Sequence, residues 1–154
     1  MEIAVCDTST LIRLRKGKAL HCLTHLFKKI CIPTGVQKEC LDHVLSEASQ
    51  KPPFEVQMVK NSFNLNKVLG LGETEAINLA VELAVEIILI DDEEAAKTAL
   101  KFNLTPLKSK DILLIAKENG MITSVKATLD TMRANGENFT DNMYRKIIKE
   151  AGEI

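Results

Sequence analysis

The 154-residue sequence is poor in the residues that mark several protein classes. It has no tryptophan, one tyrosine and only 4% aromatic residues, which leaves little material for stacking nucleic-acid bases. The formal net charge of -1 excludes a broadly basic surface, so any contact with a polyanion must be local. Asp7 interrupts the apolar start and no run of 18 apolar residues follows, so we expect a cytoplasmic protein with no signal peptide and no membrane span.

The cysteines do not show the spacing of a zinc site or a redox motif. Cys6, Cys22, Cys31 and Cys40 form no CxxC pair and have no zinc-ligand spacing with the three histidines. Cys6 and Cys31 fall within short apolar runs, where free cysteine behaves as a small hydrophobic residue. We therefore expect reduced thiols in or near the core.

With 45% hydrophobic and 27% charged residues, the chain has the composition of one soluble globular domain. Short apolar runs rich in β-branched residues predict strands at Ile3–Cys6, Ile30–Ile32 and Ile87–Ile90, with a fourth at Leu104–Leu107 that Pro106 marks as an edge strand. Between the runs, apolar residues recur at helical spacing. Strands that alternate with helices predict an α/β fold whose parallel sheet is covered on both faces.

Beyond about residue 110 the pattern is wholly helical. We expect helices near 110–119, 124–134 and 140–151, with Ser124 and Thr140 as N-caps and with Gly120, Gly136 and Gly152 after the C-terminal ends. Another helix is expected from about Glu93 to Phe102. The segment 54–68 is ambiguous between a strand and a helical excursion.

The acidic residues are most informative in their placement along these elements. Asp7 ends the first strand, Asp91 and Asp92 end a later one, and Glu39 and Glu73 lie at the starts of helical patterns. The carboxyl ends of parallel strands share one edge, where ligands bind. Carboxylates that converge there repel one another unless a cation joins them. This placement predicts a divalent-metal site for chemistry on a phosphodiester.

Each acid also has a simpler explanation. Asp7 can be a helix cap and Glu39 a surface residue. Glu73 can stabilise its helix through the dipole, although helical counting places it on the face of Ile77 and toward the sheet edge, with Glu75 pointing away. Four acids in a row from Asp91 can be a solvated helix start.

In this order, the segments VCDTSTLIRL, CIPTGVQKEC, GLGETEAINLA, IILIDDEEAAKTALKFNL and LLIAKENGMI resemble the PIN domain family of metal-dependent ribonucleases, in particular the DUF3368 group related to VapC-type toxins. Together they span nearly the whole chain. The resemblance implies one three-layer α/β/α PIN-like domain over residues 1–154. The implied domain has a mostly parallel sheet of about four or five strands and a helical portion from about residue 110.

The resemblance also implies a site that holds one or two Mg²⁺ or Mn²⁺ ions. Asp7, Glu39, Glu73 and Asp92 match the family's catalytic acids, with Asp91 beside them as a further metal ligand and Ser9 as a supporting hydroxyl. Of the aspartate pair, Asp92 is expected to be the main ligand and Asp91 to cap the next helix. The glycine-containing turn expected after the fourth strand is replaced here by LKSKDILL.

Such a site would hydrolyse RNA by two-metal chemistry, in which carboxylates fix the ions and no histidine or lysine base is required. Hard oxygen ligands suit Mg²⁺ or Mn²⁺. Candidates for contact with single-stranded or structured RNA are Arg13, Arg15, Lys108 and Lys110, although exposed basic residues are more often simply solvated.

Further expectations concern partners. An antitoxin protein is expected from the likeness to VapC-type toxins, and a homodimer from the apolar stripes of Leu129 with Met132 and of Met143 with Ile147 and Ile148. The competing hypothesis is a non-catalytic PIN-fold module, or an RNA-binding subunit regulated by its partner. A phosphoaspartate phosphatase is disfavoured because Ser9 stands where its second acid belongs, and a receiver domain because its acid pair would follow the first strand.

Overall fold

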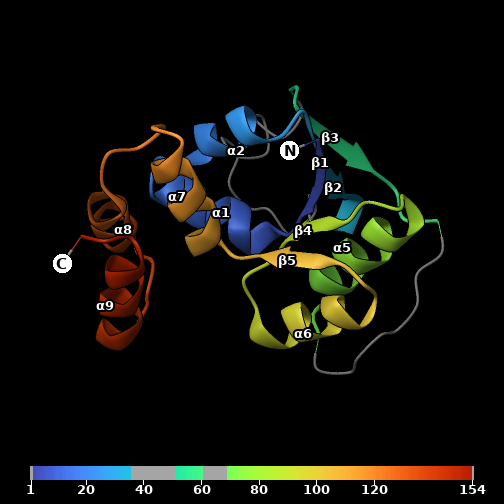
Figure 1. The fold of residues 1–154 in the computed structure, drawn as a ribbon. Helices are drawn as coiled ribbons and strands as arrows, with labels where there is room; N and C mark the ends of the chain where they lie inside the picture. The colour runs from blue at the N-terminus through green and yellow to red at the C-terminus, as the bar shows by residue number, and fades with distance from the viewer. Residues whose placement is uncertain (1, 36–50, 61–68, 154) are drawn as a thin grey trace.

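The sheet is the centre of the molecule (Figure 1). The computed structural model describes residues 2–35, 51–60 and 69–153, in which five parallel strands lie in the order β3-β2-β1-β4-β5. The strands are β1 (Ile3–Cys6), β2 (Lys29–Pro33), β3 (Phe54–Gln57), β4 (Ile87–Leu89) and β5 (Thr105–Leu107). The four predicted strands are confirmed, and Pro106 lies in an edge strand as expected. The start of the ambiguous segment 54–68 is strand β3.

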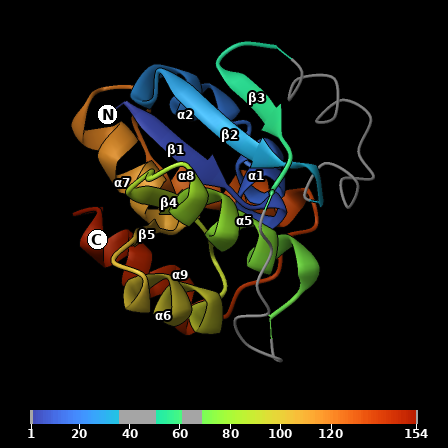
Figure 2. The same cartoon turned by 90° about the vertical axis from the view of Figure 1, so that its right-hand side faces the viewer.

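Helices cover both faces of this sheet, so the fold is a three-layer α/β/α arrangement (Figures 1 and 2). On one face lie α5 (Leu71–Glu82) and α6 (Glu93–Lys101). On the other lie α1 (Thr8–Lys16), α2 (Leu20–Leu26) and α7 (Ser109–Glu118), while α8 (Val125–Ala134) and α9 (Asp141–Glu150) pack outside them. The parallel sheet covered on both faces is thus confirmed.

The alternating directions of β1 side chains explain why two cores form. Ala4 and Cys6 join the core under α1, α2 and α7, whereas Val5 joins the core under α5 and α6. Apolar residues of the last two helices are buried in the first core as well: Leu129, Met132, Ile147 and Ile148. These stripes, from which a homodimer was expected, therefore pack mainly within their own chain, and only Met143 among them remains exposed.

The helix ends follow their sequence signals. Ser124 and Thr140 accept hydrogen bonds as N-caps of α8 and α9. Gly120, Gly136 and Gly152 have φ of 73°, 96° and 70°, the left-handed conformation in which a glycine avoids the strain of a Cβ.

Cys6, Cys22 and Cys31 are buried free thiols, as predicted, and Cys40 lies outside the described residues. Of the helices described, none is long and apolar enough to cross a membrane.

Candidate active site at the carboxyl edge of the sheet

Asp7 lies at the carboxyl end of the central strand. Its backbone N–H donates to the carbonyl of Leu89 in β4 at 2.9 Å, which ties the ends of the two strands together. It occupies the N-cap position of α1, yet its side chain makes no capping hydrogen bond. Instead Ser9 Oγ donates to Asp7 Oδ2 at 2.9 Å, and the residue is only 3% exposed. Helix capping therefore does not explain this buried carboxylate.

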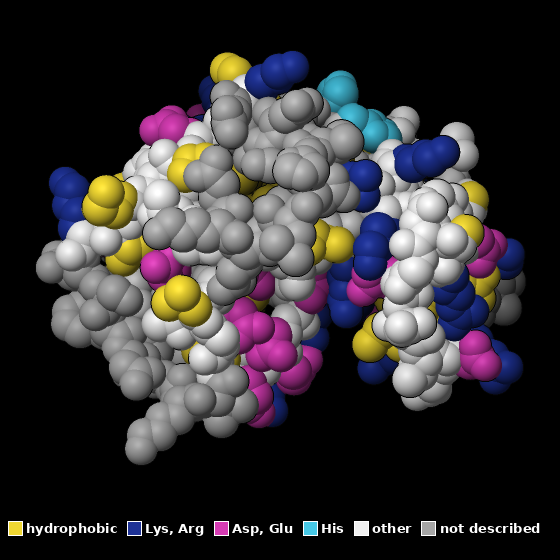
Figure 3. All heavy atoms as spheres, turned by 180° about the vertical axis from the view of Figure 1, so that it is seen from behind, with side chains coloured by type: hydrophobic (Ala, Val, Ile, Leu, Met, Phe, Trp, Pro, Cys, Tyr) yellow, Lys and Arg dark blue, Asp and Glu magenta, His cyan; other side chains and the backbone are white. Residues whose placement is uncertain are grey.

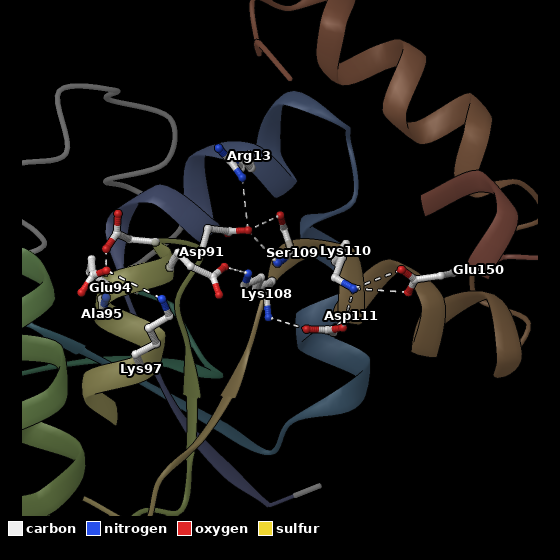
Figure 4. A network of polar contacts seen from close by, with 12 residues as sticks. Arg13, Asp91, Glu94, Ala95, Lys97, Lys108, Ser109, Lys110, Asp111 and Glu150 are labelled. Atoms are coloured by element: carbon white, nitrogen blue, oxygen red, sulfur yellow. Dashed lines mark hydrogen bonds and ion pairs between the residues drawn. The ribbon is translucent and has the colours of Figure 1, made fainter. Parts of the chain in front are cut away.

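Asp91 lies at the end of the neighbouring strand and is held by four hydrogen bonds (Figure 4). Its Oδ1 accepts from Arg13 Nη1 at 3.2 Å, from the backbone N–H of Ser109 at 3.1 Å and from Ser109 Oγ at 2.8 Å. Its Oδ2 accepts from Thr10 Oγ1 at 2.8 Å. Of the roughly four acceptor positions of this carboxylate, the protein uses those of Oδ1 in full and one of Oδ2.

Asp92 has the role that was expected of Asp91. Its Oδ2 accepts from the backbone N–H of Ala95 at 2.9 Å and caps α6. The prediction that Asp91 caps the helix is wrong by one position, because α6 begins at Glu93 and the residue directly before it is the N-cap. The same shift leaves Asp91, not Asp92, facing α1 and the start of α7.

The acids of α5 also differ from the expectation. Glu73 Oε2 accepts from the backbone N–H of Gly70 at 2.9 Å, so it caps its own helix. Glu75, which was expected to point away, accepts from the backbone N–H of Gly35 at 2.6 Å, just beyond β2. A Cβ on Gly35 would lie 2.0 Å from Glu75 Oε2, so only glycine permits this approach. Glu75 therefore reaches the carboxyl edge.

The negative charges of Asp7 and Asp91 both act on the buried thiol of Cys6. Burial, followed by the negative charges of Asp7 and Asp91, raises the pKa of the Cys6 thiol well above its usual value. Within the described ranges, no three Asp, Glu, His or Cys side chains are close enough together to form a metal site. Glu39 lies outside those ranges, so convergence of the full predicted set is untested.

The donor chemistry nonetheless fits a hard divalent cation, because the acidic side chains that the structure describes at this edge offer oxygen ligands. Asp7 fits best, since its carboxylate is buried at the strand end and is not used for capping. Glu73 and Asp92 each engage one oxygen with a backbone N–H, whereas both oxygens of Asp91 already accept hydrogen bonds.

Three of the four basic residues expected to contact RNA line a groove, and each of them forms an ion pair with an acidic side chain. Arg13 Nε donates to Glu137 Oε1 at 2.8 Å as well as contacting Asp91. Lys108 pairs with Glu93, and Lys110 with Glu150 at 3.2 Å (Figure 4). All three basic residues line a cavity of about 480 Å³, whereas Arg15 lies in the last turn of α1 and is not part of its lining. In Figure 3 a deep hollow separates a group of acidic side chains from the C-terminal helices, which carry many Lys and Arg side chains.

Several residues of the site were missed by sequence reasoning: Thr10, Glu75, Ser109 and Glu137. Ser109 belongs to LKSKDILL, the segment noted as a departure from the family pattern, and its two bonds to Asp91 show what that segment does. Glu75 stands one helical turn before the buried Asn78 and Leu79, a spacing that could have placed it inward. Glu137 has no local sequence signal, because its partner Arg13 lies 124 positions away.

The sheet order, the helical layers and the aspartates at two adjacent strand ends define a PIN-like α/β protein. The DUF3368 family model, described as a PIN domain, matches residues 3–153, and the chain belongs to this family, whose domains are generally nucleases that commonly use divalent metal ions.

A solved structure is also similar in fold: a PilT N-terminus domain protein, SSO1118, from the hyperthermophilic archaeon Sulfolobus solfataricus P2. It has a TM-score of 0.55 and 19% sequence identity over 75% of this chain and 94% of that one. No curated relative matches the sequence.

Proposed function

We propose that this protein is a Mg²⁺- or Mn²⁺-dependent endoribonuclease. The observation that carries the proposal is Asp7, a buried carboxylate at the end of the central strand that does not cap the helix it precedes. Burying a carboxylate is costly, and buried titratable groups of this kind cluster at functional sites. Membership of the PIN domain family supports the same reaction.

The residues have distinct roles in this proposal. Asp7 and Glu39 would hold a cation, and Glu73 and Asp92 would have to come closer to Asp7 than the structure places them to contribute their second oxygens. Ser9 fixes the orientation of the Asp7 carboxylate through its 2.9 Å hydrogen bond. A bound divalent ion supplies an activated water and stabilises charge on the departing oxygen. Asp91 keeps Arg13 and Ser109 in place at the same edge.

A second candidate, a non-catalytic RNA-binding module, is favoured by one observation. Arg13 already provides a cation to Asp91, so this carboxylate is electrostatically balanced without a metal. A toxin role with an antitoxin partner rests on the resemblance to VapC-type toxins alone. Growth arrest on expression, relieved by the product of an adjacent reading frame, would test that role.

The decisive comparison is between the parent protein and Asp7→Asn, with Glu86→Gln as a control on an exposed acid before β4. We expect Asp7→Asn to abolish Mn²⁺-dependent cleavage of single-stranded RNA while the protein stays folded. Mn²⁺ should raise the melting temperature of the parent and of the control but not of Asp7→Asn, since a ligand stabilises only a state that binds it. Equal cleavage by parent and Asp7→Asn would refute the proposal. A parent that binds RNA without Mn²⁺-dependent cleavage would support the second candidate.

A further inference from the structure

The groove beside Asp91 combines two kinds of lining. One part is charged, and its four basic residues, Arg13, Lys108, Lys110 and Lys146, lie there together with the acids Asp91, Glu93, Glu137 and Glu150. The other is apolar and comes from α7, α8, α9 and the α8–α9 connection: Leu113, Leu129, Met132, Phe139, Met143 and Ile147. At about 480 Å³ the cavity falls in the ~300–1,000 Å³ range of small-ligand sites. Since Asp91 is part of its lining, the groove begins at the candidate catalytic edge.

Phe139 gives the apolar part an unusually well-held ring. The Phe139 and Tyr144 rings are nearly parallel, with centroids 6.2 Å apart. The guanidinium carbon of Arg133 lies 4.7 Å from the Phe139 centroid and 4.3 Å from that of Tyr144. Arg133 and Tyr144 do not line the groove, so they support Phe139 from outside it. Met143, 47% exposed, adds an accessible apolar side chain to the lining of the same groove.

The basic side chains of the charged part can exchange their present partners for phosphate. Lys108 and Lys110 pair with Glu93 and Glu150 at partly exposed positions, where ion pairs contribute little. Lys146 lies on the groove side of α9 and makes no ion pair within the described residues. A polyanion would therefore displace weak pairs, and one cation is already available to it.

We propose that this groove binds one nucleotide of single-stranded RNA, with its base against Phe139 and Met143 and its phosphate toward Lys146 and Lys108. This inference rests on the proposed ribonuclease function and adds a base-binding subsite on the C-terminal helices. Single-stranded RNA is recognised largely by bases that stack on aromatic rings, and a phosphate-bearing ligand fits the basic lining. The groove would thus fix which nucleotide lies next to the cleaved bond.

The test measures binding of fluorescent RNA hexanucleotides by anisotropy in EDTA, because the proposed hydrolysis uses a metal-activated water and cannot proceed without the ion. Phe139→Leu removes the ring but keeps an apolar side chain, and Phe102→Leu is its control at an exposed phenylalanine after α6. Lys146→Glu reverses one groove charge, and Lys149→Glu makes the same change on α9 outside the groove. Melting curves check that all four variants are folded.

We expect Phe139→Leu and Lys146→Glu each to weaken binding about tenfold, the usual size for one stacked base, while both controls bind like the parent. An abasic residue at one position of the oligonucleotide should weaken binding to the parent by a similar factor and have little further effect on Phe139→Leu. If the abasic residue weakens binding equally in the parent and in Phe139→Leu, the inference is overturned. A parent protein that binds no oligonucleotide would overturn it as well.

The two proposals fail differently. Oligonucleotide binding that depends on Phe139, without any Mn²⁺-dependent cleavage of RNA, would overturn the nuclease and keep the groove. Cleavage by a protein whose binding is unaffected by Phe139→Leu and Lys146→Glu would keep the nuclease and overturn the groove.

Discussion

Glu153 joins the segment after α9 to the start of α8, and its replacement should weaken the fold by an amount that the structure sets. Its carboxylate accepts from Lys117 Nζ at 3.0 Å, Ser124 Oγ at 2.9 Å and the backbone N–H groups of Val125 and Lys126 at 2.7 and 3.0 Å. Burial opposes ionisation and would raise its pKa, but these bonds outweigh burial and lower the pKa from 4.5 to about 2.

That difference in pKa corresponds to ~3 kcal/mol of unfolding free energy. The side chain keeps 14% exposure and hence some contact with water, so we expect about 2 kcal/mol from Glu153→Gln at pH 7. At ~2–4 °C for each kcal/mol, the melting temperature should fall by about 4–8 °C. Glu118→Gln, at an exposed position near the end of α7, is the control and should change little.

The sign of the pH dependence provides a second check. Because the folded pKa is depressed, the carboxylate stabilises the protein above pH 4.5 and this contribution disappears as the pH falls toward 2. The difference between parent and Glu153→Gln should therefore shrink over that interval in urea denaturation. A difference that stays constant down to pH 3, or no difference at pH 7, would refute the reasoning.

Two further outcomes are expected. Asp92→Ala should lower the free energy of unfolding by about 1 kcal/mol, because α6 loses its cap. Asp91→Ala should lower it by about 2–3 kcal/mol, because four donors lose their acceptor. Urea denaturation that gives the reverse order would contradict the roles described here. Light scattering at micromolar concentration should give twice the 17.1 kDa of one chain, through the exposed Leu100 near the end of α6. Leu100→Glu should then yield monomers and Met58→Glu should not, and a strict monomer for the parent would rule out the dimer.

The strands and C-terminal helices were predictable because their signals are local. Ile3–Cys6 is a continuous apolar run whose last three residues are buried on the two faces of the sheet, and Ser124 with Gly136 marks the two ends of one helix. The side-chain roles were less predictable. Asp91 and Asp92 differ by one position, and which of them caps α6 depends on where the helix begins. Glu75 was misplaced because α5 is buried around much of its circumference, which weakens any argument from a single stripe.

The ion pair of Arg13 with Asp91 also bears on the order in which the protein is assembled. Lys16 and Arg13 both bind Glu137, and Arg13 in turn binds Asp91, so charges from α1, the α8–α9 connection and the sheet edge balance one another within the chain. Asp91 consequently needs no external cation to be buried. Burial of this carboxylate during folding is therefore independent of the metal concentration around the newly made chain.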